Sequence, residues 1–342
     1  MSRTAVVLFN LGGPDSIAAV RPFLLNLFRD PAIIRLSKPL RWLVARLIVR
    51  GRRRVAEDMF RFLGGASPIL ANTRAQAQAL EAALGPGFKV FVAMRYWHPM
   101  SQQVAVAVKG WAPDRVVLLP LYPQYSTTTT ASSIEAWHQA AERIGLRAPT
   151  DIVCCYPRGE GFVAALTELL RAALAEEPPS DTSRVLFSAH GLPRSIVAAG
   201  DPYRWQVEAT VAAVRSALAR EELDGVICYQ SRVGRLKWLG PETADEIRRA
   251  GRERRPLIVV PVAFVSEHSE TLVELDRDYA RLAAEVGVPR YRRLATVGTH
   301  PHFIAGLATL VRQRLGKGLG SATGGRICPL ELGGCPCAGD VP

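Results

Sequence analysis

The chain lacks any apolar run long enough to span a lipid bilayer. Its N-terminal segment also lacks the long apolar core and the small-residue cleavage site of a secretory signal, and residues 5–10 have instead the character of a first β-strand. The first absence excludes a transmembrane helix, and the second argues against secretion. Together they predict a cytoplasmic protein.

Apolar residues make up 48% of the 342 residues and charged residues 22%, which is typical of a globular protein of two domains. The net charge is +12, and arginines alternate with bulky apolar residues between positions 41 and 54. Such a stretch can lie on an anionic membrane surface, or it can be a core helix with a solvated basic face, and both alternatives stay open. A nucleic-acid partner would rest on net charge alone, so none is expected.

Short apolar runs alternate with helical patterns along most of the chain. Several runs are continuous in Val, Leu and Ile, as expected for strands buried on both faces of a parallel sheet. The predicted strands are residues 5–9, 89–94, 115–119, 151–155, 184–188, 225–229 and 256–262, and the predicted helices are residues 69–84, 133–144, 161–175, 202–219 and 269–286. This alternation predicts an α/β protein whose active site lies at the carboxyl ends of its strands.

Two of the six histidines lie just after predicted strands. His190 precedes a Gly-Leu-Pro turn that would hold its ring at a rigid sheet edge, and His268 follows the run 256–262. A lone histidine at a strand end is more often structural than catalytic, but the turn adds weight to a functional role for His190.

Four carboxylates are spaced so that a helix would carry them as one stripe: Glu267, Glu270, Glu274 and Asp278. Like charges repel one another, so this stripe weakens the helix unless cations or protons compensate. A solvated helix face is the ordinary explanation. Because His268 opens the same helix, a metal or proton path is the alternative, and carboxylate with imidazole suits a divalent first-row metal.

Polar and aromatic loops follow several of the predicted strands, at residues 10–14, 95–99, 122–126 and 230–241. Together they would line a cleft with aromatic walls, arginines and hydroxyls, which suits a large flat aromatic ligand that bears carboxylates. The pair Gly12-Gly13 lacks the spacing of the dinucleotide and Walker motifs, so no nucleotide cofactor is expected.

Three of the six cysteines crowd the glycine-rich tail and three lie in the body of the chain: Cys328, Cys335 and Cys337, and Cys154, Cys155 and Cys228. In a cytosolic chain, clustered cysteines favour metal ligation over disulfides. A fourth ligand would come from the body, and since adjacent strand residues point to opposite faces, only one of Cys154 and Cys155 would face the tail. An iron–sulfur cluster, a zinc ion and an unliganded, disordered tail are the alternatives.

Seven short motifs, spread in order along nearly the whole chain, resemble those of the ferrochelatase family, and the tail is similar to that of bacterial members with a C-terminal iron–sulfur extension. Their number and order argue against coincidence. The motifs are Asn10-Leu11-Gly12-Gly13-Pro14, Gly64-Gly65-Ala66-Ser67-Pro68-Ile69, Leu121-Tyr122-Pro123-Gln124-Tyr125-Ser126, Ser188-Ala189-His190-Gly191-Leu192-Pro193, Gln230-Ser231-Arg232-Val233-Gly234, Trp238-Leu239-Gly240-Pro241 and His268-Ser269-Glu270-Thr271-Leu272-Val273-Glu274-Leu275-Asp276.

The resemblance implies an α/β fold of two Rossmann-like domains, each a parallel four-stranded sheet flanked by helices, with an active-site cleft between them. Domain 1 would comprise residues 1–121 plus 300–320, domain 2 residues 122–299, and the iron–sulfur extension residues 321–342. The implied lyase reaction inserts Fe²⁺ into protoporphyrin IX, forms protohaem and releases two protons, as the last step of haem biosynthesis. A coproporphyrin ferrochelatase or a cobalt chelatase is the alternative.

The resemblance also implies the roles of individual residues. His190 and Glu270 fall at catalytic positions that contact the iron substrate, with His190 as proton acceptor or iron ligand. The positions implied for substrate binding are Leu11, Arg52, Ser67, Arg95, Tyr122, Trp238, Phe264, His268, Glu274 and Asp278. The ligands implied for a 2Fe–2S cluster are Cys154, Cys328, Cys335 and Cys337, with Cys155 as the alternative to Cys154. The expected partners are porphyrin, ferrous iron and, peripherally, the anionic inner face of the membrane.

Overall fold

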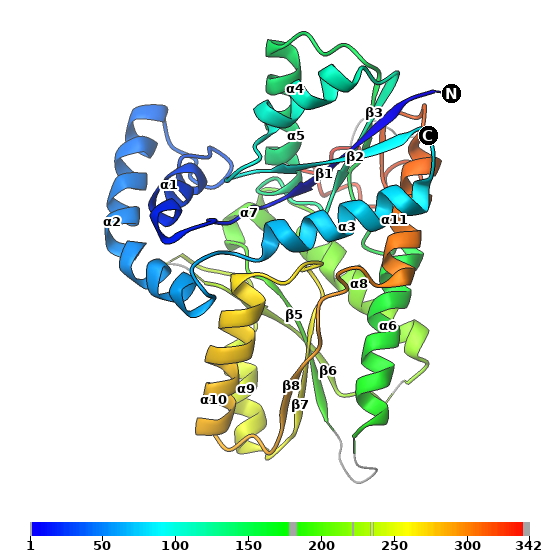
Figure 1. The fold of residues 1–342 in the computed structure, drawn as a ribbon. Helices are drawn as coiled ribbons and strands as arrows, with labels where there is room; N and C mark the ends of the chain where they lie inside the picture. Colours follow the sequence, from blue (N-terminus) through cyan, green and yellow to red (C-terminus); the bar gives the residue numbers. More distant parts are fainter. Residues whose placement is uncertain (1, 178–182, 221, 233, 235, 338–342) are drawn as a thin grey trace.

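The computed structural model describes residues 2–177, 183–220, 222–232, 234 and 236–337. Two parallel β-sheets lie one above the other, with helices packed around them (Figure 1). The strand order is β2-β1-β3-β4-β9 in the first sheet and β6-β5-β7-β8 in the second. Every pairing between these strands is parallel. The predicted α/β fold with two parallel sheets is therefore confirmed.

The first sheet is built around β1. Its strands are β1 (Thr4–Asn10), β2 (Phe88–Met94), β3 (Arg115–Pro120), β4 (Thr150–Val153) and β9 (Leu319–Gly320). Val6 and Leu8 of β1 face the side covered by α3 (Ile69–Leu84) and α11 (Pro301–Arg314). Val7 and Phe9 face the other side, covered by α4 (Ser101–Trp111) and α5 (Thr130–Arg143). Because helices cover both faces, the strand is apolar from Ala5 to Phe9.

The second sheet is built around β5. Its strands are β5 (Arg184–His190), β6 (Gly225–Gln230), β7 (Leu257–Pro261) and β8 (Tyr291–Arg293). Val185 and Phe187 of β5 enter the same core as Val6 and Leu8, together with α6 (Glu160–Ala175) and α8 (Tyr203–Leu218), whereas Leu186 faces α9 (Thr243–Arg252) and α10 (Ala280–Glu285). The short α7 (Arg194–Ala198) follows β5. One apolar core therefore lies between the two sheets.

Two helices near the N-terminus cover neither sheet. Helices α1 (Ile17–Phe28) and α2 (Lys38–Phe62) pack on each other through Val20, Val49 and Phe60 and project from one flank of the molecule (Figure 1). Helix α2 contains the stretch of alternating arginines and apolar residues. In the described part of the chain, no helix has both the length and the apolar content that crossing a membrane requires.

The first sheet differs from the expected four strands because the tail adds a fifth. Leu319 pairs with Ile152 and Gly320 with Val153, and the Asp151 carboxylate accepts hydrogen bonds from the backbone N–H groups of Gly316 and Gly318. A two-residue strand has no periodicity that a sequence pattern can reveal. Likewise β4 lies beyond residue 121, where the first segment of domain 1 was expected to end, yet it pairs with β3. A short apolar run does not reveal which sheet it will join.

The predicted helix over residues 269–286 is present but begins in an unexpected form. Residues Glu270–Tyr279 form a π-helix, η1, and only Ala280–Glu285 form the α-helix α10. A π-helix closes i→i+5 hydrogen bonds, is rare, and often occurs at functional sites. The carboxylates of this segment are therefore displayed on a wider helix than expected.

The close approach of α6 and α11 generates the first prediction. An added Cβ at Gly161 would lie 2.2 Å from the carbonyl oxygen of His302 and 2.7 Å from the Cα of Gly306. Gly161→Ala should therefore lower the free energy of unfolding by about 1–3 kcal/mol, because the helices must separate at the shared core. Urea denaturation measures this loss.

The matched control is Gly110→Ala in α4, where an added Cβ meets nothing within 4 Å. Helix propensity alone predicts a gain of ~0.5–1 kcal/mol there. Equal unfolding midpoints for the two variants would contradict the tight helix contact.

Candidate active site

His190 is the last residue of β5 and lies at the carboxyl end of the second sheet. It stands opposite Gln230, the last residue of β6. The chain turns immediately afterwards, and an added Cβ at Gly191 would lie only 2.9 Å from the Gln230 carbonyl oxygen. Only glycine allows this approach, so the turn holds the imidazole at the sheet edge.

His190 forms a close pair with Glu270. The distance from His190 Nδ1 to Glu270 Oε2 is 2.8 Å, although the residues are 80 positions apart. Glu270 lies in the first turn of η1, and the side chains remain 38% and 25% exposed. Because the carboxylate contacts Nδ1, the opposite nitrogen, Nε2, points away from it and can meet a ligand.

The electrostatics of the pair favour an imidazolium beside a carboxylate. Burial opposes charge on His190, but the Glu270 carboxylate outweighs this effect and holds the pKa of His190 above its ordinary value. Burial likewise opposes ionisation of Glu270, yet the nearby His190 and His268 hold the pKa of Glu270 well below its usual range. Glu270 therefore makes His190 a stronger base than an isolated histidine.

His268 and Phe264 complete the surroundings of this pair. His268 is buried, and its Nε2 lies 3.9 Å from Glu270 Oε2, while its Nδ1 lies 3.0 Å from the Ser266 carbonyl oxygen and so donates to it. The Phe264 ring lies 6.4 Å from His190 and 4.9 Å from His268, measured between ring centroids. The structure thus brings four of the predicted site residues together.

Glu274 is held in a polar network and is not part of a solvated helix face. Its carboxylate accepts hydrogen bonds from the Gln230 amide at 2.9 Å, the Ser231 backbone N–H at 2.8 Å and the Tyr279 hydroxyl at 3.0 Å. The Ser231 hydroxyl also donates to Glu274 and lies 3.4 Å from Glu270 Oε2. Ser231 therefore connects the two carboxylates, a role that its place in a polar loop did not reveal.

The other two members of the expected stripe lie elsewhere. Glu267 pairs with Arg293 at 2.5 Å and accepts a hydrogen bond from the Thr296 backbone N–H, so it does not join the row formed by Glu270 and Glu274. Asp278 pairs with the neighbouring Arg277 at 2.8 Å near the surface. The expected single stripe of four carboxylates was wrong, because Glu267 precedes the helix.

Residues of the first sheet approach the same edge. Asn10, at the carboxyl end of β1, donates to Ser266 Oγ at 3.4 Å, and Asn72 of α3 donates to the Glu267 carbonyl oxygen at 2.9 Å. These contacts bring Leu11 and the loop after β1 to the loop that carries Phe264. The carboxyl ends of the two sheets therefore meet.

The remaining predicted positions differ in how they are held. The Arg95 guanidinium is bound to the buried Asp30 at 2.7 Å and to Ser132 Oγ at 2.6 Å. Ser67 lies against Gly13, because a Cβ added at Gly13 would lie 2.5 Å from the Ser67 side chain. Arg52 is exposed on α2, and Tyr122 is partly buried after β3.

Trp238 packs beside the turn at Gly191. Its buried indole N–H has no hydrogen-bond partner in the described part of the chain, as expected of a group that meets a ligand.

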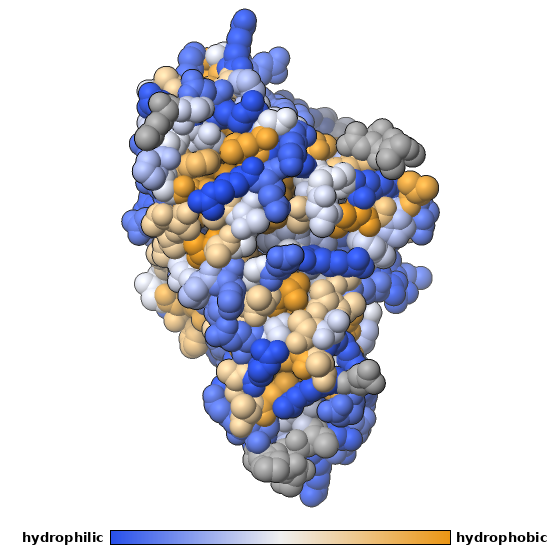
Figure 2. All heavy atoms as spheres, turned by 90° about the vertical axis from the view of Figure 1, so that its right-hand side faces the viewer, coloured by the Kyte–Doolittle hydropathy of each residue, from blue (hydrophilic) through white to orange (hydrophobic). Residues whose placement is uncertain are grey.

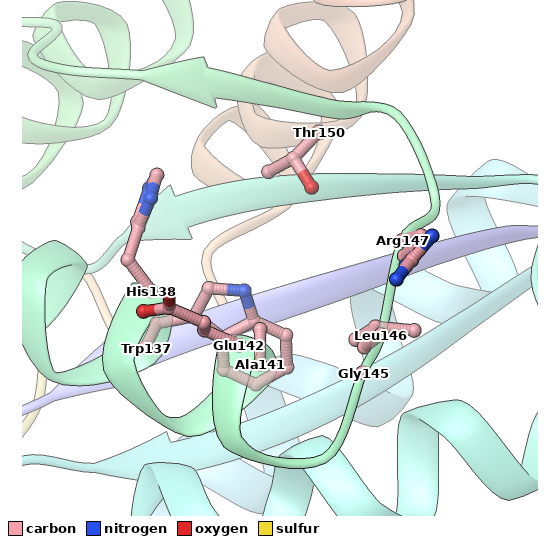
Figure 3. A pocket seen from close by; sticks show the side chains of 8 residues that line it. All are labelled: Trp137, His138, Ala141, Glu142, Gly145, Leu146, Arg147 and Thr150. Atoms are coloured by element: carbon pink, nitrogen blue, oxygen red, sulfur yellow. The ribbon is translucent and has the colours of Figure 1, made fainter.

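Two pockets lie outside this arrangement. One, of about 380 Å³, is formed by α5 and the loop leading into β4, and includes Trp137, His138 and Arg147 (Figure 3). It lies at the amino end of β4, whereas ligands of open α/β sheets bind at the carboxyl ends. The other, of about 410 Å³, lies between Arg194, Arg204 and Leu239, beside the turn after His190. The first pocket therefore has no part in the candidate site.

The family model named Ferrochelatase matches residues 3–315. The chain belongs to the ferrochelatase family. A protein of Caulobacter vibrioides named Ferrochelatase is 51% identical over 343 residues, which cover 98% of this chain and 97% of the relative. A protein of the same name from Rickettsia bellii is 44% identical over 349 residues, covering 99% and 96%. The family model ends before the cysteine tail, whereas these relatives align over almost the whole chain.

Solved structures share the fold at much lower sequence identity. SirB from Bacillus subtilis with Fe³⁺ aligns with a TM-score of 0.56 and 13% identity, covering 93% of this chain and 97% of SirB. CbiX aligns with a TM-score of 0.51 and 17% identity, covering 92% and 99%. The two-sheet arrangement is therefore shared with other chelatases.

The cysteine tail of this family member folds back onto the first sheet. Cys328, Cys335 and Cys337 are buried against Cys154 and Cys155, and all are free thiols. The distance from Cys154 Sγ to Cys337 Sγ is 3.8 Å, and that from Cys154 Sγ to Cys155 Sγ is 3.4 Å. The expectation of a disordered tail therefore fails through residue 337, and residues 338–342 lie outside the described residues.

The expectation that only one of Cys154 and Cys155 faces the tail was also wrong. Strand β4 ends at Val153, so the rule of alternating faces does not apply to the two cysteines that follow it. Cys228 belongs instead to the core beneath Leu186, on β6. Contacts with Cys328 and Cys337 lower the pKa of Cys335, whereas the contact with Cys154 raises the pKa of Cys337.

The His190–Glu270 pair predicts a pH dependence that can be measured without metal. In the wild type, the raised pKa keeps His190 protonated to a higher pH than an ordinary histidine. Glu270→Gln removes the nearest negative charge and leaves the burial and the more distant Glu274, so the pKa of His190 should fall. NMR titration of the histidine ring protons measures both values, with His190→Ala to identify the signal. An unchanged midpoint in Glu270→Gln would contradict the pairing.

Proposed function

We propose that this family member inserts Fe²⁺ into protoporphyrin IX, forms protohaem and releases two protons, as the terminal step of haem biosynthesis. The observation that carries the proposal is the His190–Glu270 pair at the meeting point of the two sheet edges, with Nε2 of His190 directed away from the carboxylate. A base of raised proton affinity in this position suits a substrate whose ring nitrogens must lose protons before a metal enters.

The chemistry that the residues supply begins with the shape of the ring. A free-base porphyrin is planar and must buckle before iron reaches its nitrogens, so walls that fit the buckled form stabilise the transition state. Phe264 and Trp238, each held by neighbouring turns, supply such walls on the side of the second sheet. Leu11 and Tyr122 supply the opposing side in this proposal.

In its neutral form, His190 then accepts a proton from a pyrrole N–H, which leaves the ring nitrogen free to bind Fe²⁺. Glu270 stabilises the imidazolium formed in this step. Ser231 links Glu270 to Glu274, so its hydroxyl can pass the proton on from one carboxylate to the other. His268 extends the polar path at one end. Asp278, which is paired with Arg277 near the surface, is the proposed outer end of the path. In the alternative role of His190 as iron ligand, the same nitrogen, Nε2, binds the iron in a step separate from proton transfer.

Arg52 and Ser67 are proposed to hold the porphyrin propionates. Arg52 is exposed and can reach a carboxylate, while Ser67 stands at the loop after α2 beside Gly13. Arg95 differs from them because Asp30 and Ser132 occupy its guanidinium. We therefore assign Arg95 to the wall of the cleft.

The relatives distinguish this reaction from its alternatives. The proteins named Ferrochelatase are 44–51% identical over nearly the full length, whereas SirB, solved with Fe³⁺ and with cobalt, shares 13–14% identity and only the fold. Iron is therefore favoured over cobalt. Coproporphyrin has more propionates than protoporphyrin. Arg52 and Ser67 are the only propionate contacts in this proposal, so protoporphyrin is favoured as the substrate.

The test is an anaerobic insertion assay with each porphyrin, followed by absorbance. Wild type should convert protoporphyrin faster than coproporphyrin. His190→Ala should lose at least about 90% of turnover and keep porphyrin affinity, because the base acts after docking. Wild-type turnover in His190→Ala, or no metallation by the wild type, would contradict the proposal.

We propose further that the tail holds a 2Fe–2S cluster through Cys154, Cys328, Cys335 and Cys337. Four buried thiols with no disulfide between them fit an all-cysteine cluster, and the contact between Cys154 and Cys337 favours Cys154 over Cys155. When bound, such a cluster supplies a one-electron redox centre and a covalent link between β4 and the tail. The fully assembled chain would therefore keep its tail on the first sheet.

Colour tests the cluster against zinc, which four thiolates also suit. Anaerobic protein should be red-brown and contain about two irons per chain with acid-labile sulfide. Cys154→Ser should bleach the protein, whereas Cys155→Ser should not. A colourless wild type that contains zinc would reject the cluster.

We propose that α2 rests on the anionic inner face of the membrane, which places this cytoplasmic chain at the bilayer. Its apolar side chains are unusually exposed, with Leu47 at 61%, Leu43 at 50% and Trp42 at 45%. Arg46 stacks over Trp42 at 4.4 Å, so charge and apolar surface are interleaved. Figure 2 shows a different face of the molecule, that of α6 and α11, for comparison. There, hydrophilic side chains divide the apolar areas.

Vesicle flotation tests this contact. Binding should require anionic lipid and weaken as salt rises, because screening reduces the attraction of arginines to the surface. Leu47→Glu should weaken binding about tenfold, whereas the control Val106→Glu, at a residue 56% exposed on α4, should not. Binding that ignores lipid charge, or equal effects of the two variants, would reject the membrane contact.

A further inference from the structure

A glutamine of α8 reaches the cysteine cluster from the body of the chain. Gln206 is completely buried, and its side-chain Nε2 lies 3.2 Å from Cys328 Sγ. A buried amide that ends on a sulfur is a specific arrangement, because an unpaired amide in this position would be costly.

The orientation of this amide follows from its second contact. The backbone N–H of Tyr125 donates to Gln206 Oε1 at 2.8 Å. An N–H can only pair with the oxygen of the amide, so the nitrogen is turned toward Cys328. The sulfur therefore receives an N–H hydrogen bond.

The segment that carries Gln206 is fixed on several sides. Buried Asp201 accepts hydrogen bonds from Ser126, Thr127 and Tyr203, and Gly334 of the tail donates to the Gly200 carbonyl oxygen at 3.0 Å. The start of α8 is therefore locked both to the loop after β3 and to the tail. The backbone that carries Gln206 is therefore fixed, and rotation of its side chain would leave the Tyr125 N–H without this acceptor.

We infer that Gln206 tunes the reduction potential of the cluster proposed above, through its N–H hydrogen bond to the sulfur of Cys328. Hydrogen bonds to cluster sulfurs are one of the determinants of the potential. Reduction adds negative charge to the sulfurs, so a donor stabilises the reduced form more than the oxidised form. Removing the donor makes the cluster harder to reduce. The inference rests on the proposed cluster.

Gln206→Met keeps the length of the side chain and removes the N–H donor. Its midpoint potential, measured by redox titration of the holoprotein, should shift to a more negative value. The expected effect is a decrease of about tenfold in the equilibrium constant for reduction, which corresponds to ~59 mV for a one-electron couple. Gln206→Leu is the second variant, since its apolar side chain also lacks the donor and adds no charge, and it should shift in the same direction.

Thr210→Val is the matched control. Thr210 lies one turn further along α8 and is also completely buried. Its hydroxyl contacts the carbonyl oxygens of Pro157 and Gln206 and the Gln124 amide, and among the described residues it makes no hydrogen bond to a cysteine. A general disturbance of α8 would affect this variant as well, whereas loss of the sulfur contact would not. The control should therefore keep the wild-type potential.

Pulsed EPR of the reduced wild-type protein gives a readout that does not depend on any variant folding. Protein with nitrogen-15 in its glutamine side chains should show a coupling between the cluster and one labelled nitrogen. Wild-type potential in Gln206→Met or Gln206→Leu with the cluster intact, or no nitrogen coupling, would overturn the inference while leaving the cluster itself in place. A wild type without cluster iron would instead overturn the cluster proposal and this inference together.

Discussion

A single apolar core lies between the two sheets, and the meeting of their carboxyl edges beside His190 and Glu270 depends on it. Val6 and Leu8 of the first sheet and Val185 and Phe187 of the second enter this one core, so neither sheet can move without the other. Close packing makes such a core resist small displacements. Its consequence is that the carboxyl edges of both sheets meet at a fixed separation, where Asn10 reaches Ser266.

The fixed edges explain why a charged pair persists in a partly buried position. A histidine and a glutamate removed from water would each be costly alone, and together they satisfy one another. His190 is set by the turn at Gly191, and Glu270 by the start of a π-helix. The same segment delivers Glu274 to Ser231, which turns isolated carboxylates into a connected path. The tail depends on the core more indirectly, because it attaches to β4 and to the start of α8.

The sequence predicted those features that local patterns encode. The apolar run from Val6 to Phe9 predicted a buried strand. The Gly-Leu-Pro turn after His190 predicted a rigid sheet edge. The contact between His190 and Glu270 came only from the family resemblance, since 80 residues separate the two. The fifth strand, the shared side of Cys154 and Cys155, and the link through Ser231 were not predictable, because each depends on where distant segments pack. Glu267 illustrates the same limit, since Arg293 and Thr296 draw it out of the expected stripe.

The central claim is that His190 and Glu270 act as one unit in metal insertion. A double-mutant cycle on turnover, with His190→Ala, Glu270→Gln and the combined variant, tests this claim most directly. The combined variant should be no slower than His190→Ala alone, because Glu270 acts through the imidazole that is already absent. Losses that multiply in the combined variant would show that the two residues act independently and would contradict the account.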